Sequence, residues 1–201
     1  MAFTYFFRDM QTLEMIRDHV VPTLRTRRFA HIWDAGCAMG LEPYTLAIVL
    51  RENMGPMIFR NVSMHATDID ESNLFEDIIK EGLYPWEQVE RIPKDIFTRY
   101  FAPADKPDHF RIAEEIRKCV SYQKHNLLNL EPVRKDFILI VCKNVLLHFN
   151  ESERIKVIEM FHDALVEGGF FATEQTQKMP KELESIFEPV VPNAQLFRKV
   201  G

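Results

Sequence analysis

One stretch, residues 30–46, constrains the fold of this chain more than any other. Residues 30–35 are mostly apolar and predict a short buried strand. Gly36 and Gly40 then allow a tight turn, because a residue without a Cβ reaches backbone conformations that other residues avoid. Residues 42–53 predict an amphipathic helix with a proline in its first turn, where a missing N–H costs nothing. This order is typical of α/β folds that hold nucleotide-like ligands, although loose glycine motifs also occur in other α/β cores.

The rest of the chain continues this alternation of strands and helices. Apolar residues at helical spacing predict a helix over 9–21 that Pro22 ends. A second strand over 62–68 should run parallel to the first, and Asp70 or Ser72 should cap the helix that follows it. The further predicted elements are that helix over about 71–80 closed by Gly82, a nearly all-apolar central strand over 137–142, a helix over 151–166 ended by Gly168 and Gly169, and an antiparallel edge pair over 169–173 and 195–199. Together they predict an α/β, Rossmann-like fold whose sheet is mostly parallel with an antiparallel edge.

The segment 83–125 departs from this alternation. Four prolines interrupt residues 83–110, where only a short helix over about 94–101 is expected. Residues 109–125 lack helical periodicity and predict short antiparallel strands. We therefore expect one domain over 1–201, with a small antiparallel β-subdomain inserted at about 105–125.

The composition excludes several classes of function. A hydrophobic content of 46% supports a substantial core, and the net charge of −5 gives no reason to expect a nucleic-acid partner. The three cysteines are far apart and lack metal-ligand spacing, which suits a reducing compartment. No apolar run approaches membrane-spanning length, and the N-terminus has no signal-peptide pattern. We expect a monomeric cytoplasmic protein without a metal site or membrane insertion.

Polar residues follow four of the predicted strands. Gly36 and Glu42 follow the first, Asp68 ends the second, and the pairs 125–126 and 143–144 follow two later strands. The carboxyl ends of parallel strands meet at one edge of the sheet, so these residues should share one site. Asp68 could hold ribose hydroxyls or cap the following helix, and taken alone it favours neither interpretation. No GxxxxGK[ST] phosphate loop is present, and the acids favour a cofactor with a cationic reactive end, such as S-adenosylmethionine.

The order of short motifs along the chain resembles that of the chemotaxis receptor methyltransferases, the CheR-type protein-glutamate O-methyltransferases. Their motifs read roughly T-x-F-F-R, W-x-A-x-C-x-x-G-E-E-P-Y-S, A-T-D-I-D, N-L-L and C-R-N-V-L-I-Y-F, followed by a strand that ends near S-E. This chain has counterparts in the same order at residues 4–8, 33–45, 66–70, 126–128, 142–149 and 173–174. Each motif is short, but the six in order span almost the whole chain, and they imply the class I methyltransferase fold.

The resemblance implies a role for each matching residue. Thr4 and Arg8 would reach the cofactor and the methyl acceptor, and Arg8 would orient the acceptor carboxylate. Glu42 would contact the amino-acid end of S-adenosylmethionine, Asp68 would hold its ribose, and His148 would face the transferred methyl group. The implied catalytic residues are Arg8 and His148, and the implied cofactor-binding residues are Thr4, Arg8, Ala35, Gly36, Gly40, Glu42, Asp68, Ile69, Asn126, Leu127, Lys143 and Asn144.

The chain departs from the family motifs at three positions and at its start. Leu41 replaces the first Glu of E-E-P-Y, while Glu42 remains. Lys143 replaces an Arg, which keeps the charge but loses the planar fork that binds carboxylates in two places. His148 replaces a Tyr and, unlike a phenol, can titrate near neutral pH, although it could also be a hydrogen-bonded residue at a corner. The first motif begins at Thr4, so the family's helical N-terminal domain is expected to be lacking.

Three functions agree with these residues. The resemblance favours transfer of a methyl group from S-adenosylmethionine to glutamate side chains in the cytoplasmic region of a chemoreceptor or similar protein. The first alternative is a methyltransferase with the same cofactor and another acceptor, since Lys143 and His148 lie on the acceptor side. The second is a non-catalytic S-adenosylmethionine-binding regulator, which the retention of both cofactor and acceptor residues disfavours.

Overall fold

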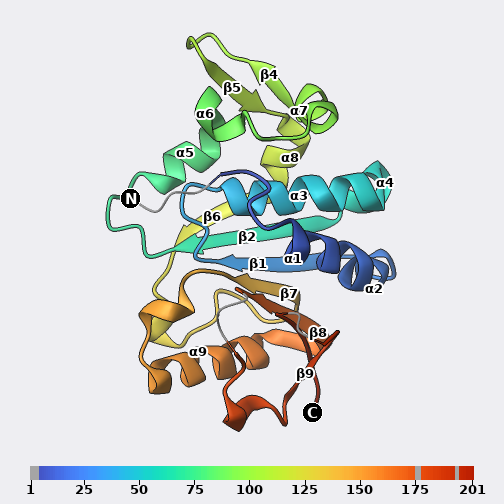
Figure 1. Ribbon diagram of the computed structural model, residues 1–201, viewed down its shortest axis with the longest axis vertical. Coiled ribbons are helices and arrows are strands. Elements are labelled where there is room, and N and C mark those ends of the chain that lie inside the picture. Colours follow the sequence, from blue (N-terminus) through green and yellow to red (C-terminus); the bar gives the residue numbers. More distant parts are fainter. Residues whose placement is uncertain (1–4, 175–177, 193–194) are drawn as a thin grey trace.

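The fold is organised around a mainly parallel sheet (Figure 1). A computed structural model describes residues 5–174, 178–192 and 195–201. Within these ranges seven strands form the main sheet in the spatial order β6-β2-β1-β7-β8-β10-β9. These strands are β1 (Ala30–Ala35), β2 (Val62–Asp68), β6 (Val120–Lys124), β7 (Phe137–Cys142), β8 (Leu165–Thr173), β9 (Phe187–Pro189) and β10 (Leu196–Lys199).

The register of the central strands brings their carboxyl ends to one edge. β1 pairs in parallel with β2 from Ala30↔Val62 to Ala35↔Thr67, and with β7 on its other side. β7 can occupy the centre because all six of its residues are buried and apolar, as a strand covered on both faces requires. β8 and β10 pair antiparallel at the far side. The predicted fold class, a mostly parallel sheet with an antiparallel edge, is confirmed.

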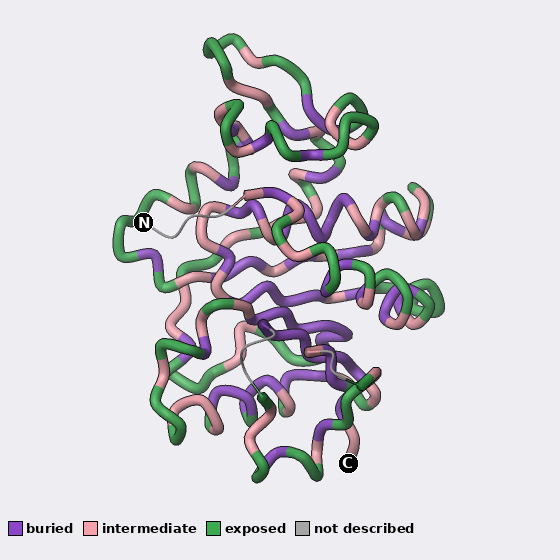
Figure 2. The backbone as a smooth tube through the Cα atoms, viewed as in Figure 1, coloured by how far each residue is buried: buried purple, intermediate pink, exposed green. Residues whose placement is uncertain are grey.

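Helices cover both faces of the sheet, with α3 on one face and α9 on the other (Figure 1). Figure 2 shows buried residues concentrated in the central strands and on the inner sides of these helices. The helical elements in the described residues are α1 (Met10–Met15), η1 (Ile16–Val20), α2 (Val21–Arg25), α3 (Leu41–Met54), α4 (Pro56–Phe59), α5 (Phe75–Glu81), α6 (Trp86–Val89), α7 (Lys94–Tyr100), α8 (Glu114–Cys119), η2 (Leu127–Asn129), η3 (Leu146–His148), α9 (Glu151–Ala164) and η4 (Lys181–Leu183). None of those in the ranges given above is long and apolar enough to cross a lipid bilayer.

The first helical segment does not end at Pro22, contrary to the sequence prediction. α1 passes into a π-helical stretch, η1, and α2 continues the run to Arg25. The Val21 N–H bonds five residues back to the Ile16 carbonyl, as in a π-helix, so a new α-helical turn begins there. Pro22 lies in the first turn of α2, where its missing N–H needs no partner.

The predicted end of the helix over 151–166 is also wrong, because Gly168 and Gly169 do not terminate α9. α9 ends at Ala164 and β8 begins immediately, so both glycines lie inside the strand. The β7–β8 register jumps from Phe137↔Leu165 to Leu139↔Phe170, and the extra residues of β8 form a bulge. A Cβ on Gly169 would lie 2.9 Å from the carbonyl oxygen of Val166, and this crowding explains the glycine.

A small antiparallel sheet is present, but it lies earlier in the chain than predicted. It consists of β3 (Leu83–Pro85), β5 (His109–Ile112) and β4 (Phe101–Pro103), with β5 in the middle. The predicted bounds of about 105–125 are wrong for its C-terminal part, because residues 114–119 form α8 and β6 joins the main sheet parallel to β2. α8 is short and only Ile116 in it is buried, so the sequence shows no helical period there.

Candidate functional site

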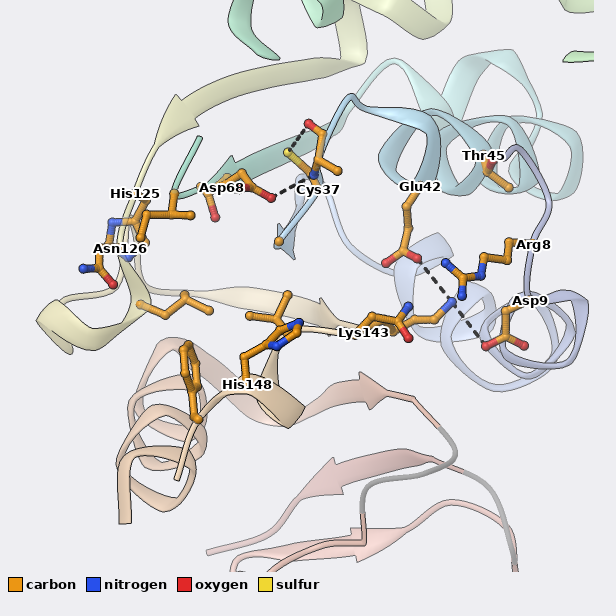
Figure 3. A pocket seen from close by; sticks show the side chains of 18 of the residues that line it. Arg8, Asp9, Cys37, Glu42, Thr45, Asp68, His125, Asn126, Lys143 and His148 are labelled. Atoms are coloured by element: carbon orange, nitrogen blue, oxygen red, sulfur yellow. Dashed lines mark hydrogen bonds and ion pairs between the residues drawn. The ribbon is translucent and has the colours of Figure 1, made fainter. Parts of the chain in front are cut away.

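A pocket of about 670 Å³ opens at the carboxyl ends of β1, β2, β6 and β7 (Figure 3). The segment before α1 and the loops after these four strands line it. Its lining residues are Tyr5, Phe7, Arg8, Asp9, Leu13, Gly36, Cys37, Ala38, Glu42, Thr45, Thr67, Asp68, Ile69, Glu71, His125, Asn126, Leu127, Leu128, Lys143, Asn144, Val145, His148 and Phe149.

The turn after β1 forms the floor of the pocket. The N–H groups of Gly36 and Cys37 both donate to the Thr67 carbonyl oxygen, at 2.7 and 3.0 Å. Gly36 has a φ of +102°, and a Cβ there would lie 2.1 Å from a methyl carbon of Val145. Gly40 has a φ of +89°, and a Cβ there would instead lie 2.6 Å from the side chain of Ile79. A side chain on Gly36 would therefore collide with the pocket lining, whereas one on Gly40 would collide with the core beneath the pocket floor.

Asp68 fixes the turn after β1 to the end of β2. Its Oδ2 accepts a hydrogen bond from the Ala38 N–H at 2.9 Å, and its Oδ1 accepts one from the Asp70 N–H at 3.1 Å. Asp68 does not cap the next helix, and neither does Asp70 in the strict sense: α5 begins at Phe75 rather than near residue 71, and Leu74 is its N-cap residue. Asp70 instead accepts from the Leu74 and Phe75 N–H groups at 3.3 and 3.0 Å. Each carboxylate oxygen has two lone pairs, so Asp68 can still accept hydrogen bonds from a ligand in the pocket.

The loop after β6 adds an uncharged wall beside Asp68. The Asn126 side-chain oxygen accepts from the Leu128 N–H at 3.0 Å and caps η2, while its amide nitrogen remains a donor. The His125 N–H donates to the Asp68 carbonyl oxygen at 2.8 Å. Burial lowers the pKa of His125, whose ring packs edge-on against Trp33 with 5.8 Å between ring centroids. The imidazole of His125 is therefore uncharged at neutral pH.

The opposite end of the pocket is charged (Figure 3). The Lys143 ammonium lies 3.2 Å from an Asp9 carboxylate oxygen and 3.2 Å from a Glu42 carboxylate oxygen. The Lys143 side chain is only 8% exposed, whereas those of Asp9 and Glu42 are 23% and 29% exposed. The lysine thus lies behind the two acids, and part of each acid remains accessible from the pocket.

The pKa values at this end move in different directions. Burial raises the pKa of Glu42, although the nearby Lys143 and Arg8 oppose the rise. Burial alone would raise the pKa of Asp9, but Lys143 and the hydrogen bonds from Thr12 outweigh it and lower the value. Burial would lower the pKa of Lys143, but the two carboxylates outweigh that effect and raise it. Asp9 and Lys143 are therefore held in their charged forms, and Glu42 is the acid that protonates more easily.

A buried acid, Asp34, lies behind the charged end. It is 1% exposed, and neither of its carboxylate oxygens has a hydrogen-bond partner among the residues that the structure describes. Burial raises its pKa well above the usual range, and the negative field of Glu42 adds to this effect. Asp34 is thus biased toward its protonated, neutral form.

The segment 5–9 runs between the inserted sheet and the pocket, and we call it the N-terminal strap. Phe6 is 1% exposed and packs edge-on against Tyr84 of β3 and Phe101 of β4, at centroid distances of 5.1 and 5.3 Å. The Phe7 N–H donates to the Thr45 hydroxyl at 3.2 Å, and Phe7 has a φ of +59°. This turn in the strap brings the two residues that follow Phe7 into the pocket lining.

His148 ends the 3₁₀ turn η3 on the wall across from Asp68 and Glu42 (Figure 3). It is exposed and lines the pocket. Asn144 lies between Lys143 and η3 with a φ of +58°, and its N–H donates to Glu174 at 3.0 Å. That bond fixes the strand end from which Lys143 projects.

Sequence comparisons agree with this geometry. The profile of the family described as "CheR methyltransferase, SAM binding domain" matches residues 2–192. The chain belongs to the CheR methyltransferase family. A chemotaxis protein methyltransferase of Borreliella burgdorferi is 32% identical over 193 residues, which cover 91% of this chain and 67% of that protein. Chemotaxis protein methyltransferase 2 of Pseudomonas aeruginosa is 32% identical over 84% of this chain and 61% of its own length.

Solved structures agree on the fold. A crystal structure of a methyltransferase from Geobacter sulfurreducens superposes with a TM-score of 0.53 at 13% identity and covers 96% of this chain and 80% of that one. The CheR chain therefore has the class I methyltransferase fold, and S-adenosylmethionine is its cofactor.

The pocket brings together most of the residues that the CheR motifs indicated. Ala35 and Gly40 do not line it, and Thr4 lies outside the described residues. The predicted residues that do line it are Arg8, Gly36, Glu42, Asp68, Ile69, Asn126, Leu127, Lys143, Asn144 and His148.

Sequence reasoning placed His125 at this edge of the sheet but missed Asp9 and Thr45, which also line the pocket. Asp9 carried a usable signal, because an aspartate directly before a helical segment predicts an N-cap close to the motif. The Leu41 departure has no effect on the lining, since Leu41 is fully buried in the core.

Proposed function

We propose that this CheR-family chain transfers the methyl group of S-adenosylmethionine to glutamate side chains in the cytoplasmic region of a chemoreceptor-type protein. One observation carries the proposal: a single pocket joins Asp68 at one end, the Glu42–Lys143–Asp9 cluster at the other, and the exposed Arg8 and His148. The relatives' names, which specify chemotaxis, support the choice of substrate. We propose a cytoplasmic location on the same ground.

The residues present fit the cofactor. A volume of about 670 Å³ lies within the range of pockets for small ligands. Asp68 and Asn126 would hold the adenosine part, because they offer the acceptors and the donor that ribose hydroxyls and an adenine edge require. Glu42 would hold the ammonium group of the amino-acid part, and Lys143, which lies behind Glu42, would position the carboxylate of Glu42. Gly36 would let the backbone approach the ligand closely.

The chain's own residues then have little chemistry to perform. When bound, S-adenosylmethionine would supply a methyl group on a positively charged sulfur, so that a carboxylate oxygen can bond to the methyl carbon while the sulfur leaves as the neutral thioether of S-adenosylhomocysteine. A free glutamate has a pKa of about 4.3, so the acceptor is already ionised near pH 7 and needs no general base. Arg8 would hold one oxygen of the acceptor and leave the other oxygen free, and His148 would donate a hydrogen bond on the acceptor side. The closed floor of the pocket would exclude water from the reacting oxygen.

Labelled-methyl transfer to a receptor cytoplasmic fragment tests the proposal. Base-labile label on glutamate would support the proposal. A loss of this labelling when Arg8 is replaced would support the role of Arg8 in orienting the acceptor carboxylate. The absence of S-adenosylhomocysteine binding in calorimetry would contradict the assignment of the pocket. A second acceptor class gains support from His148, an exposed residue in place of the family's Tyr, and label on another substrate would favour it.

A further inference from the structure

We propose that Asp9 is a positioning residue of the cofactor site: by sharing Lys143 with Glu42, it keeps the Glu42 carboxylate available to a ligand's ammonium group. This inference rests on the proposed function. It assigns a role to a residue that lies next to the first motif and outside it.

The geometry shows one cation divided between two acids. Lys143 Nζ is 3.2 Å from Asp9 Oδ2 and 3.2 Å from Glu42 Oε2. Because the lysine is 8% exposed, its ammonium depends on these carboxylates rather than on solvent. With Asp9 neutral, the full attraction of Lys143 would fall on Glu42.

Asp9 is fixed independently of Lys143. Its Oδ1 accepts from the Thr12 N–H at 3.1 Å, and its Oδ2 accepts from the Thr12 hydroxyl at 2.8 Å. Asp9 thereby caps α1, while Glu42 lies in the first turn of α3. Two separate helix starts hold the two acids, so Lys143 stays between them.

The charges of this end match those of an amino acid. Asp9 and Glu42 are acidic, Lys143 and Arg8 are basic, and the field of Arg8 also reaches Glu42. A bound amino-acid group brings one ammonium and one carboxylate, which a balanced set can accept. Without the charge of Asp9 the set has a net positive charge, and Lys143 competes with the ligand's ammonium for Glu42.

Two probes separate this effect from general damage to the site. S-adenosylhomocysteine and 5′-methylthioadenosine share adenosine and a thioether sulfur, but only the first carries an amino-acid group. Asp9→Asn should raise the Kd of S-adenosylhomocysteine about fivefold to tenfold and change that of 5′-methylthioadenosine by less than about twofold. Asparagine retains an oxygen for the Thr12 N–H, so the helix cap is kept.

A double-mutant cycle tests whether Asp9 acts through Lys143. In a Lys143→Met background, Asp9→Asn should leave the ratio of the Kd values of the two probes unchanged. With Lys143 present, Asp9→Glu keeps the negative charge and should retain most of the natural affinity for S-adenosylhomocysteine. If Asp9→Asn does not fold, Asp9→Ser, which also caps helices, replaces it.

Three outcomes overturn the inference. These are an unchanged Kd of S-adenosylhomocysteine in Asp9→Asn, an equal rise in Kd for both probes, or the same selective rise in the Lys143→Met background. Failure of the wild-type protein to bind S-adenosylhomocysteine would instead overturn the proposed function, and the two results are therefore distinguishable.

Discussion

The two ends of the pocket are built in different ways. At the Asp68 end, a carboxylate is fixed by the backbone N–H groups of Ala38 and Asp70, and the uncharged loop after β6 lies beside it. At the Glu42 end, two carboxylates and a buried lysine hold one another through ion pairs. The first end is held by the fold itself, and the second is held by a balance of charges.

This difference has a consequence for how each end responds to change. The loss of a hydrogen bond to a backbone group changes the local structure. A change in the balance of charges instead changes which ligand groups bind, with little change in the shape of the pocket. The two probes introduced above, with and without an amino-acid group, report on the two ends separately.

Asp68→Ala should weaken the binding of both probes by about 100-fold, because the variant loses the proposed contacts with the ribose and the hydrogen bonds that hold the turn after β1. Calorimetry measures both affinities. Asp68→Asn is the matched control, since it keeps one acceptor oxygen, and it should lose less. Normal binding of 5′-methylthioadenosine by Asp68→Ala would show that this end does not hold the adenosine.

Glu42→Gln should weaken the binding of S-adenosylhomocysteine by about 30-fold and leave that of 5′-methylthioadenosine nearly unchanged. Only the first probe has an ammonium group, and that group would lose its counter-charge. Glu52→Gln, the same change in the same helix α3, is the control, since Glu52 pairs with Arg99 and Tyr100 instead. An equal loss for both probes would remove the distinction between the two ends.

His148→Phe should lower turnover about tenfold and change the affinity for S-adenosylhomocysteine by less than about twofold, because we propose that His148, which lines the pocket, contacts the acceptor rather than the cofactor. Steady-state methyl transfer and calorimetry measure the two quantities. His148→Tyr restores the family residue and should retain turnover. Equal losses of turnover and affinity in the Phe variant would place His148 in cofactor binding instead.

Lowering the pH from 7 to 5 should weaken the binding of S-adenosylhomocysteine about threefold and leave the binding of 5′-methylthioadenosine unchanged. Burial raises the pKa of Glu42, so this acid binds a proton at a higher pH than an ordinary glutamate, and its attraction for an ammonium falls as the pH drops through that pKa. The pKa of Asp9 is lowered, so Asp9 stays charged over this range. Titration in the Glu42→Gln variant should show no such dependence, and a persisting one would assign it to another group.

Much of the fold and of the Asp68 end could be predicted from the sequence, because both depend on local patterns. Residues 30–35 and 62–68 are complete strands with the predicted bounds, and the polar residues at their ends meet as expected. The Pro22 boundary was missed because a π-helical turn leaves no signal in apolar spacing. The antiparallel sheet was displaced because its strands are only three or four residues long.

The charged end could be predicted only in part. Glu42 and Lys143 stand in recognisable motifs, but their contact with Asp9 depends on how α1, α3 and β7 meet in space. No spacing in the sequence encodes that meeting. The prediction that the acids of this site favour a cationic ligand was thus incomplete, because Glu42 also forms an ion pair with Lys143.

The N-terminal strap has a consequence for the order in which this protein is made. Phe6 packs on Tyr84 and Phe101, and Asp9 pairs with Lys143, so residues 5–9 leave the ribosome long before the side chains that hold them. Because these partners lie later in the chain, the strap cannot reach its final position until β7 and Lys143 have been made. The charged end of the pocket is therefore completed only late in synthesis, once the last third of the chain has been made and can meet its first residues.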